Sequence, residues 1–283
     1  MTRRGSCSGS TTPTQTERGP VAEFVSGEQR WIEQLGDLRN VIRQELIRRQ
    51  LKPFAKAGMA VLDIGSGQGT QAIELARAGC EVTCIEPSAQ LQALCRSAAS
   101  EAGLSLIQLT GTLDDAAQLC DPESFDIVCA HGLLMYLSSR STALGHLSHM
   151  VRPGGLLSIA FRNADGIAAR PGMRRQWAEA IVAMSADGSD RYSNGIGVEA
   201  RADRLADVQA DLAAFNVHVQ RWFGVRVFND AVAHGSSLPP GEHLAELLDA
   251  EEQAGATDPY RWFGSLIHVV AQKNFGTEQP LAT

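Results

Sequence analysis

The chain has 283 residues, of which 44% are hydrophobic and 20% charged, and its formal net charge is −7. This length allows one large domain, and no apolar run approaches the ~18 residues that a membrane-spanning helix needs. The overall acidity argues against general nucleic-acid affinity, although residues 1–60 hold ten basic against six acidic side chains and leave a local basic face possible. Six cysteines without a CxxC pair predict reduced thiols, no metal site and a cytoplasmic protein.

The N-terminal part of the chain predicts a tail followed by a helix. Residues 1–26 are rich in Ser, Thr, Gly and Pro, and we expect a disordered tail because nothing in them can form a core. No apolar segment follows the two early arginines, so a secretory signal is not expected. In residues 27–52, apolar side chains recur at helical spacing from Trp31 to Ile47, which predicts a helix.

Short apolar segments then alternate with helix-like segments. The strand-like segments are 60–64, 81–86, 104–109, 125–131 and 156–161. The helix-like segments between them are 71–78, 88–103 and 139–151. Such alternation is typical of βαβ units, and it predicts an α/β domain with a parallel sheet and helices on both faces.

The C-terminal part keeps this pattern with two interruptions. Residues 163–200 lose the rhythm, and we interpret them as an insertion or a lid. Helix-like segments at 201–214 and 241–254 and strand-like segments at 217–225 and 265–273 follow. The gap 226–264 is a second candidate insertion for substrate contact. We therefore expect residues 27–283 to form a single domain.

The turn after the first strand-like segment carries glycines at alternate positions, Gly65, Gly67 and Gly69. A phosphate-binding P-loop needs GxxxxGK[ST], and this turn has no lysine. A dinucleotide turn needs GxGxxG, and Thr70 stands at the third glycine. With Asp63, the residues read D-x-G-x-G-x-G, where the glycines allow close approach of a ligand and the acid can pair with an ammonium group. Glu86 ends the second strand, where an acid can accept both hydroxyls of a ribose; the alternative is a solvated charge.

These motifs resemble class I S-adenosylmethionine-dependent methyltransferases. The resemblance implies a Rossmann-like, mostly parallel seven-stranded sheet with an antiparallel last strand, and S-adenosylmethionine as cofactor. The cofactor-binding residues it implies are Arg39, Asp63, Gly65, Ser66, Gly67, Gly69, Glu86, Pro87, Gly111, Thr112, Leu113 and His131. Gly111–Leu113 would flank adenine, but Thr112 as an ordinary helix cap is an equal alternative. His131 would lie beside the sulfonium, with a core or capping histidine as the alternative.

A narrower resemblance covers most of residues 27–273. The stretches GDLRNVIRQEL, RPGGLLSIAFRNADG, GVRVFND and SLIHVVAQK are similar to the tRNA methyltransferases that esterify wobble uridine-5-oxyacetic acid, the CmoM group. The resemblance implies that Arg39 pairs with the cofactor carboxylate and that Arg226 grips an anionic acceptor; as alternatives, both are solvated charges. Met135, Tyr136 and Arg162 depart from the group's pattern, which affects the substrate more than the cofactor.

Three functions remain open on these grounds. The first is carboxyl O-methylation of tRNA, and the candidate RNA contacts are Arg39, Arg43, Arg48, Arg49, Lys52, Arg170, Arg174 and Arg175. The second is an O- or C-methyltransferase for a small molecule such as a sugar, quinone or specialised metabolite. The third is a regulator that binds the cofactor without catalysis. A carboxylate acceptor is ionised at neutral pH and needs no base, whereas a hydroxyl acceptor needs one, for which His131 is the candidate.

Overall fold

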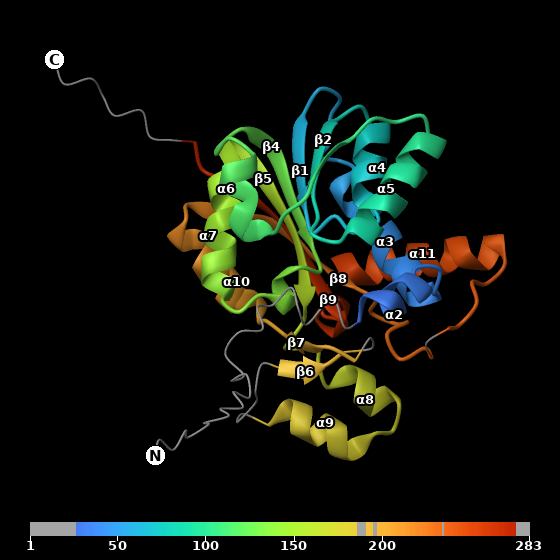
Figure 1. The fold of residues 1–283 in the computed structure, drawn as a ribbon. Coiled ribbons are helices and arrows are strands. Elements are labelled where there is room, and N and C mark those ends of the chain that lie inside the picture. Colours follow the sequence, from blue (N-terminus) through green and yellow to red (C-terminus); the bar gives the residue numbers. More distant parts are fainter. Residues whose placement is uncertain (1–26, 186–190, 195–196, 234, 276–283) are drawn as a thin grey trace, which may run out of the picture.

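Residues 27–185, 191–194, 197–233 and 235–275 are described in the computed structural model, and the predicted tail lies outside them. They form an α/β fold around a seven-stranded sheet with the order β3-β2-β1-β4-β5-β9-β8 (Figure 1). Only β9 runs antiparallel to its neighbours β5 and β8. The expected mostly parallel sheet with an antiparallel last strand is confirmed.

The strands follow the apolar segments of the sequence. Their bounds are β1 (Ala60–Ile64), β2 (Glu81–Ile85), β3 (Ile107–Leu109), β4 (Phe125–His131), β5 (Val151–Arg162), β8 (Val217–Val225) and β9 (Leu266–Lys273). Four of the five residues of β1 are buried, as expected for a central parallel strand covered on both faces. β3 is shorter than its predicted range of 104–109, and β5 begins five residues before its predicted start at 156.

Helices cover both faces of the sheet, and Figure 1 shows the two layers. One layer consists of α3 (Leu38–Leu51), α4 (Thr70–Arg77), α5 (Ala89–Glu101) and α11 (Gly241–Ala256). The other consists of α6 (Ala116–Leu119), α7 (Arg140–Met150) and α10 (Leu205–Ala214). The main hydrophobic core lies between the second layer and the sheet, where Leu144 and Val208 pack with Phe161 and Ile267.

The N-terminal helix is broken, which corrects the prediction of one helix over 27–52. The structure has α2 (Glu28–Glu33) and α3, separated by residues 34–37. Asp37 is the N-cap of α3, and its side chain accepts a hydrogen bond from the backbone N–H of Arg39 at 3.0 Å. Gly36 and this aspartate supply a stop and a start signal inside one apolar stripe, which explains the break.

The described residues of the predicted insertion lie beyond the carboxyl ends of the strands, at the bottom of Figure 1. They form α8 (Ala169–Met173), α9 (Trp177–Met184) and the pair of β6 (Arg191–Ser193) with β7 (Glu199–Arg201). The described part of the chain also has the short 3₁₀ helices η1 (Leu113–Asp115), η2 (Leu134–Tyr136) and η3 (Tyr260–Phe263). Within the described ranges, no helix is both long and apolar enough to cross a membrane.

Candidate functional site

A cavity of about 250 Å³ opens at the carboxyl ends of β1, β2 and β4. In the sheet order, the connections of β1 and β4 leave in opposite directions, which separates their loops and leaves a crevice for a ligand. Two groups of residues line it. The turn side comprises Asp63, Gly65, Ser66, Gly67, Glu86 and Pro87, and the arginine side comprises Arg39, Arg162, Arg170, Tyr192 and Arg226.

The glycine turn has a backbone that favours glycine at all three positions. Gly65, Gly67 and Gly69 have φ angles of 67°, 56° and 79°. A Cβ added at Gly67 would meet nothing within 4 Å, so this residue leaves open space. Gly69 is the N-cap of α4, and a Cβ added there would clash with the Sγ of Cys95. The first two glycines therefore serve the cavity, and the third serves the packing of α5 beneath the turn.

Asp63 lies at the turn side with its side chain 3% exposed. Burial, with smaller contributions from Cys95 and Glu86, raises the pKa of Asp63 to about 8. No cation pairs with this carboxyl among the described residues. A buried acid of this kind is suited to a cationic ligand, because an ammonium group would restore its ionised form.

Glu86 already holds the glycine turn. Its carboxylate accepts hydrogen bonds from the backbone N–H of Gly67 at 2.8 Å and of Ser88 at 2.9 Å. Burial raises the pKa of Glu86, and these two backbone bonds oppose that rise. Each oxygen keeps a second lone pair, so the carboxylate can also accept the hydroxyls of a ribose.

The predicted adenine loop lies apart from the cavity wall. Among the described residues that line the cavity, Gly111, Thr112 and Leu113 are absent. Thr112 caps η1, and Asp115 accepts hydrogen bonds from its backbone N–H and its hydroxyl, both at 2.8 Å. Leu113 belongs to the main core. The structure thus shows the capping alternative for Thr112, and contact of this loop with adenine stays a prediction.

On the arginine side, three guanidinium groups surround one buried carboxylate. Asp230 receives Arg39 at 2.9 Å, Arg226 at 3.3 Å and Arg162 at 3.5 Å. Burial acts to raise the pKa of Asp230, but these three cations, together with Arg170, hold it well below its ordinary value. The guanidinium of Arg162 also lies over the ring of Tyr192, 5.3 Å from its centroid, and its Nε has no hydrogen-bond partner among the described residues. Within the described residues, this cluster holds more positive than negative charge.

Arg226 is held in an unusual backbone conformation. Its φ angle is 58°, in the left-handed region, and the Oγ of Ser265 accepts from its Nη2 at 2.6 Å. Burial, followed by repulsion from Arg39 and Arg162, lowers the pKa of Arg226 to about 9 despite the attraction of Asp230. A cation in this situation gains from an anionic ligand.

Glu251 holds the loop that carries Arg226 and Asp230, and the sequence did not identify it. This fully buried carboxylate on α11 accepts hydrogen bonds from the backbone N–H of Val227 at 2.6 Å, Phe228 at 3.0 Å and Asn229 at 2.9 Å. The signal was present: Leu244, Leu248 and Glu251 share one helical face at spacings of four and three, so an acid sits on an apolar stripe.

His131 ends β4 and lines the cavity, as the sequence predicted. Burial, with repulsion from His268 and Arg43, lowers its pKa well below the usual value, so the ring is neutral at physiological pH. Its Nδ1 is buried and has no hydrogen-bond partner in the part of the chain that the structure describes. The ring is therefore placed to face a ligand without carrying a charge.

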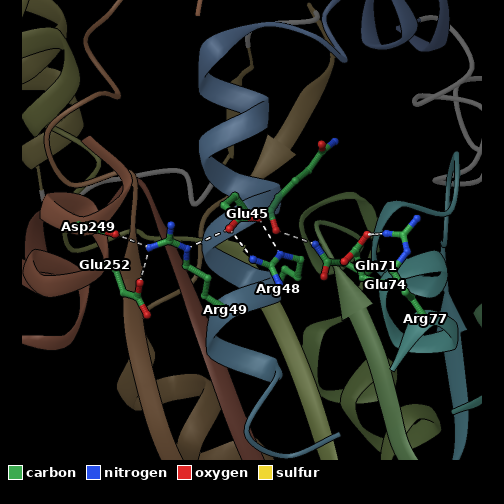
Figure 2. Close-up of polar contacts among 9 residues, drawn as sticks. Glu45, Arg48, Arg49, Gln71, Glu74, Arg77, Asp249 and Glu252 are labelled. Atoms are coloured by element: carbon green, nitrogen blue, oxygen red, sulfur yellow. Dashed lines mark hydrogen bonds and ion pairs between the residues drawn. The ribbon is translucent and has the colours of Figure 1, made fainter. Parts of the chain in front are cut away.

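The arginines of α3 do not form the open basic face that the sequence suggested. Arg39 and Arg43 line the cavity. Figure 2 shows that Arg48 pairs with Glu45 and that Arg49 bridges Glu45 to two acids of α11, Asp249 at 2.8 Å and Glu252 at 2.7 Å. These acids neutralise the outer arginines, because they lie at helical spacing or on the neighbouring helix.

Known proteins resemble this chain over the same elements. The methyltransferase domain family matches residues 62–159. A tRNA 5-carboxymethoxyuridine methyltransferase of Escherichia coli K12 is 28% identical over 249 residues, which cover 84% of this chain and 89% of that protein. A ubiquinone biosynthesis O-methyltransferase of Serratia proteamaculans is 27% identical over 138 residues, 48% of this chain and 57% of that protein. The crystal structure of a magnesium protoporphyrin IX methyltransferase of Synechocystis with bound SAH superposes with a TM-score of 0.59 at 16% identity, covering 88% and 95% of the two chains.

The burial of Asp63 predicts that this residue lowers the stability of the fold while it favours ligand binding. The folded-state pKa of Asp63, about 8, lies above its ordinary value of 3.8, so ionisation makes the fold progressively less stable between pH 4 and pH 8. Asp63→Asn should therefore raise the Tm at pH 8 by at least about 2 °C, with no gain at pH 4. The same change should weaken binding of S-adenosylhomocysteine. Calorimetry measures both effects; Asp121→Asn, at an exposed acid, is the control, and an equal gain at both pH values would contradict the prediction.

Loss of the Glu251 carboxylate should loosen the loop of the arginine side. Glu251→Ala leaves three backbone N–H groups, one of them buried and two partly buried, without their acceptor, and we expect it to lower the free energy of unfolding by about 2–4 kcal/mol. Urea denaturation measures this loss. Glu252→Ala, next in the chain, removes only a half-exposed pair with Arg49 and should cost about 1 kcal/mol or less. Equal losses in the two variants would argue against a loop-holding role.

Proposed function

We propose that this chain, an S-adenosylmethionine-dependent methyltransferase, esterifies a carboxylate on a modified wobble uridine of tRNA. The observation that carries the proposal is the cationic cluster of Arg162 and Arg226 beside the cavity, held at a carboxylate that a third arginine already pairs. The similarity to the tRNA 5-carboxymethoxyuridine methyltransferase supports the same acceptor class.

The turn side fits the cofactor. Gly67 leaves open space at its Cβ position, and Asp63 is a buried acid suited to the ammonium of the methionine part. We assign the ribose to Glu86, the methionine carboxylate to Arg39, and further contacts to Gly65, Ser66, Pro87 and His131, with adenine near Gly111, Thr112 and Leu113. Gly69 contributes through the shape of the turn. When bound, S-adenosylmethionine supplies a methyl group activated by a sulfonium.

The arginine side orients the acceptor. A carboxylate is already ionised at neutral pH, so the protein has no proton to remove and contributes by positioning. Of the three guanidinium groups that pair with Asp230, that of Arg162 is the farthest, and its buried Nε has no acceptor among the described residues. Two donors from one planar group can hold a carboxylate in a fixed orientation. Arg226 adds a second cation, whose lowered pKa reflects the cost of burying it without a full counter-charge.

The reaction can be tested on the nucleic acid itself. Purified protein and S-adenosylmethionine are incubated with tRNA from a strain that accumulates the free uridine-5-oxyacetic acid, and the nucleosides are resolved by mass spectrometry. We expect the acid to gain one methyl group as an ester. If the acid stays unchanged while a phenol or sugar hydroxyl is methylated, the acceptor belongs to the small-molecule class, which the ubiquinone-type relative represents.

Substitution of Arg162 tests acceptor binding without disrupting the fold. Arg162→Met leaves Arg39 and Arg226 at Asp230, so the buried acid keeps two partners and the fold should persist. Loss of a charge-assisted hydrogen bond to the acceptor should lower kcat/KM for the tRNA by about 10- to 100-fold, with the affinity for S-adenosylhomocysteine unchanged. Arg152→Met, at the opposite end of β5 and 46% exposed, is the matched control. Equal activity of the two variants would remove Arg162 from the acceptor site.

A further inference from the structure

A chain of hydrogen bonds crosses the sheet from the cavity to the helix layer. The Nε2 of His131 lies 2.8 Å from the Oγ of Ser158, and this Oγ lies 2.8 Å from the Nε2 of His268. The Nδ1 of His268 in turn lies 2.8 Å from the Oε1 of Gln50 on α3. The strands β4, β5 and β9 are neighbours in the sheet, and Ser158 and His268 are fully buried.

The position of each hydrogen along this chain of hydrogen bonds follows from its last residue, Gln50. The Oε1 of Gln50 can only accept, so the Nδ1 of His268 carries the hydrogen and its Nε2 carries a lone pair. The Ser158 hydroxyl has one hydrogen, which it donates to that lone pair. Ser158 therefore accepts from the Nε2–H of His131, and a neutral His131 is left with a lone pair on Nδ1.

The surroundings keep both rings neutral. Burial lowers the pKa of His268 to about 3, and burial lowers that of His131 well below its usual value. Arg43 is the cation that disfavours a positive charge on His131. Cys129 is a further polar side chain in contact with Ser158. Burial raises the pKa of the Cys129 thiol well above its usual value, so it stays protonated and brings no negative charge to the chain.

We propose that Gln50, His268 and Ser158 are positioning residues that fix His131, at the cavity wall, as the neutral tautomer with an unprotonated Nδ1. The consequence concerns the cofactor, because an imidazolium beside a sulfonium would add a second positive charge, whereas a lone pair on Nδ1 attracts the cation. No proton moves in this role. The inference rests on the position of His131 at the cavity wall and not on the identity of the acceptor.

The tautomer can be measured directly by ¹⁵N NMR of the full chain labelled at histidine. The variant His131→Gln assigns the signals of His131 in the wild type. We expect these signals to show one neutral form with the hydrogen on Nε2. Ser158→Ala removes only the central hydroxyl, and both tautomers should then be populated. Ser158→Thr keeps a hydroxyl and should restore the single form.

Ser148 provides the matched control. Its hydroxyl is also buried, on α7, and has no hydrogen-bond partner among the described residues, so Ser148→Ala should leave the tautomer of His131 unchanged. In turnover with whichever acceptor is methylated, Ser158→Ala should lower kcat about 10-fold through misorientation, with KM for S-adenosylmethionine within about twofold of the wild type.

Two results would overturn the proposal. One is a hydrogen on Nδ1 of His131 in the wild type, which would reverse the whole chain. The other is a Ser158→Ala variant with an unchanged single tautomer. The NMR measurement needs no acceptor, so its outcome is independent of whether tRNA proves to be the substrate.

Discussion

The burial of one carboxylate, Asp230, organises the arginine side of the cavity. Its three arginine partners come from α3, from the end of β5 and from the loop after β8. A buried acid and a single cation partner would have a net charge close to zero, whereas this cluster has a net positive charge within the described residues. Removing an acid of this kind would leave buried cations facing one another, so its constraint on the three segments is strong.

The same cluster explains why this part of the site lowers the free energy of unfolding. Arg226 adopts a left-handed backbone conformation, its pKa is lowered by burial, and the carboxylate of Glu251 must hold its loop through the backbone. Asp63, which also lines the cavity, is buried with a raised pKa. A cavity whose lining holds both a buried acid and buried cations is suited to ligands that carry charges of both signs.

The sequence predicted the sheet and the turn side well, because their signals are local. The ranges 60–64, 125–131 and 217–225 agree with the strands, and the positive φ angles at the alternate glycines explain the motif. The arginine side depends on contacts between residues far apart in the chain, such as Arg39 with Asp230, and spacing gives no information on those. The bonds that connect His131 to Gln50 cross three strands and were equally hidden, although each residue lies in a predicted element.

The ion pairs of Arg49 in Figure 2 join α3 to α11. Arg39 on α3 lines the cavity, and Glu251 on α11 holds the loop that carries Arg226 and Asp230. The acids on α11 are substantially exposed, so dissolved salt weakens these bridges as it weakens contacts with RNA phosphates. Under the proposed function, a decline of tRNA affinity with ionic strength would therefore combine two processes, ion release from the nucleic acid and weakening of the ion pairs between α3 and α11. The slope of such a titration would overcount phosphate contacts unless the salt dependence of these ion pairs is measured separately.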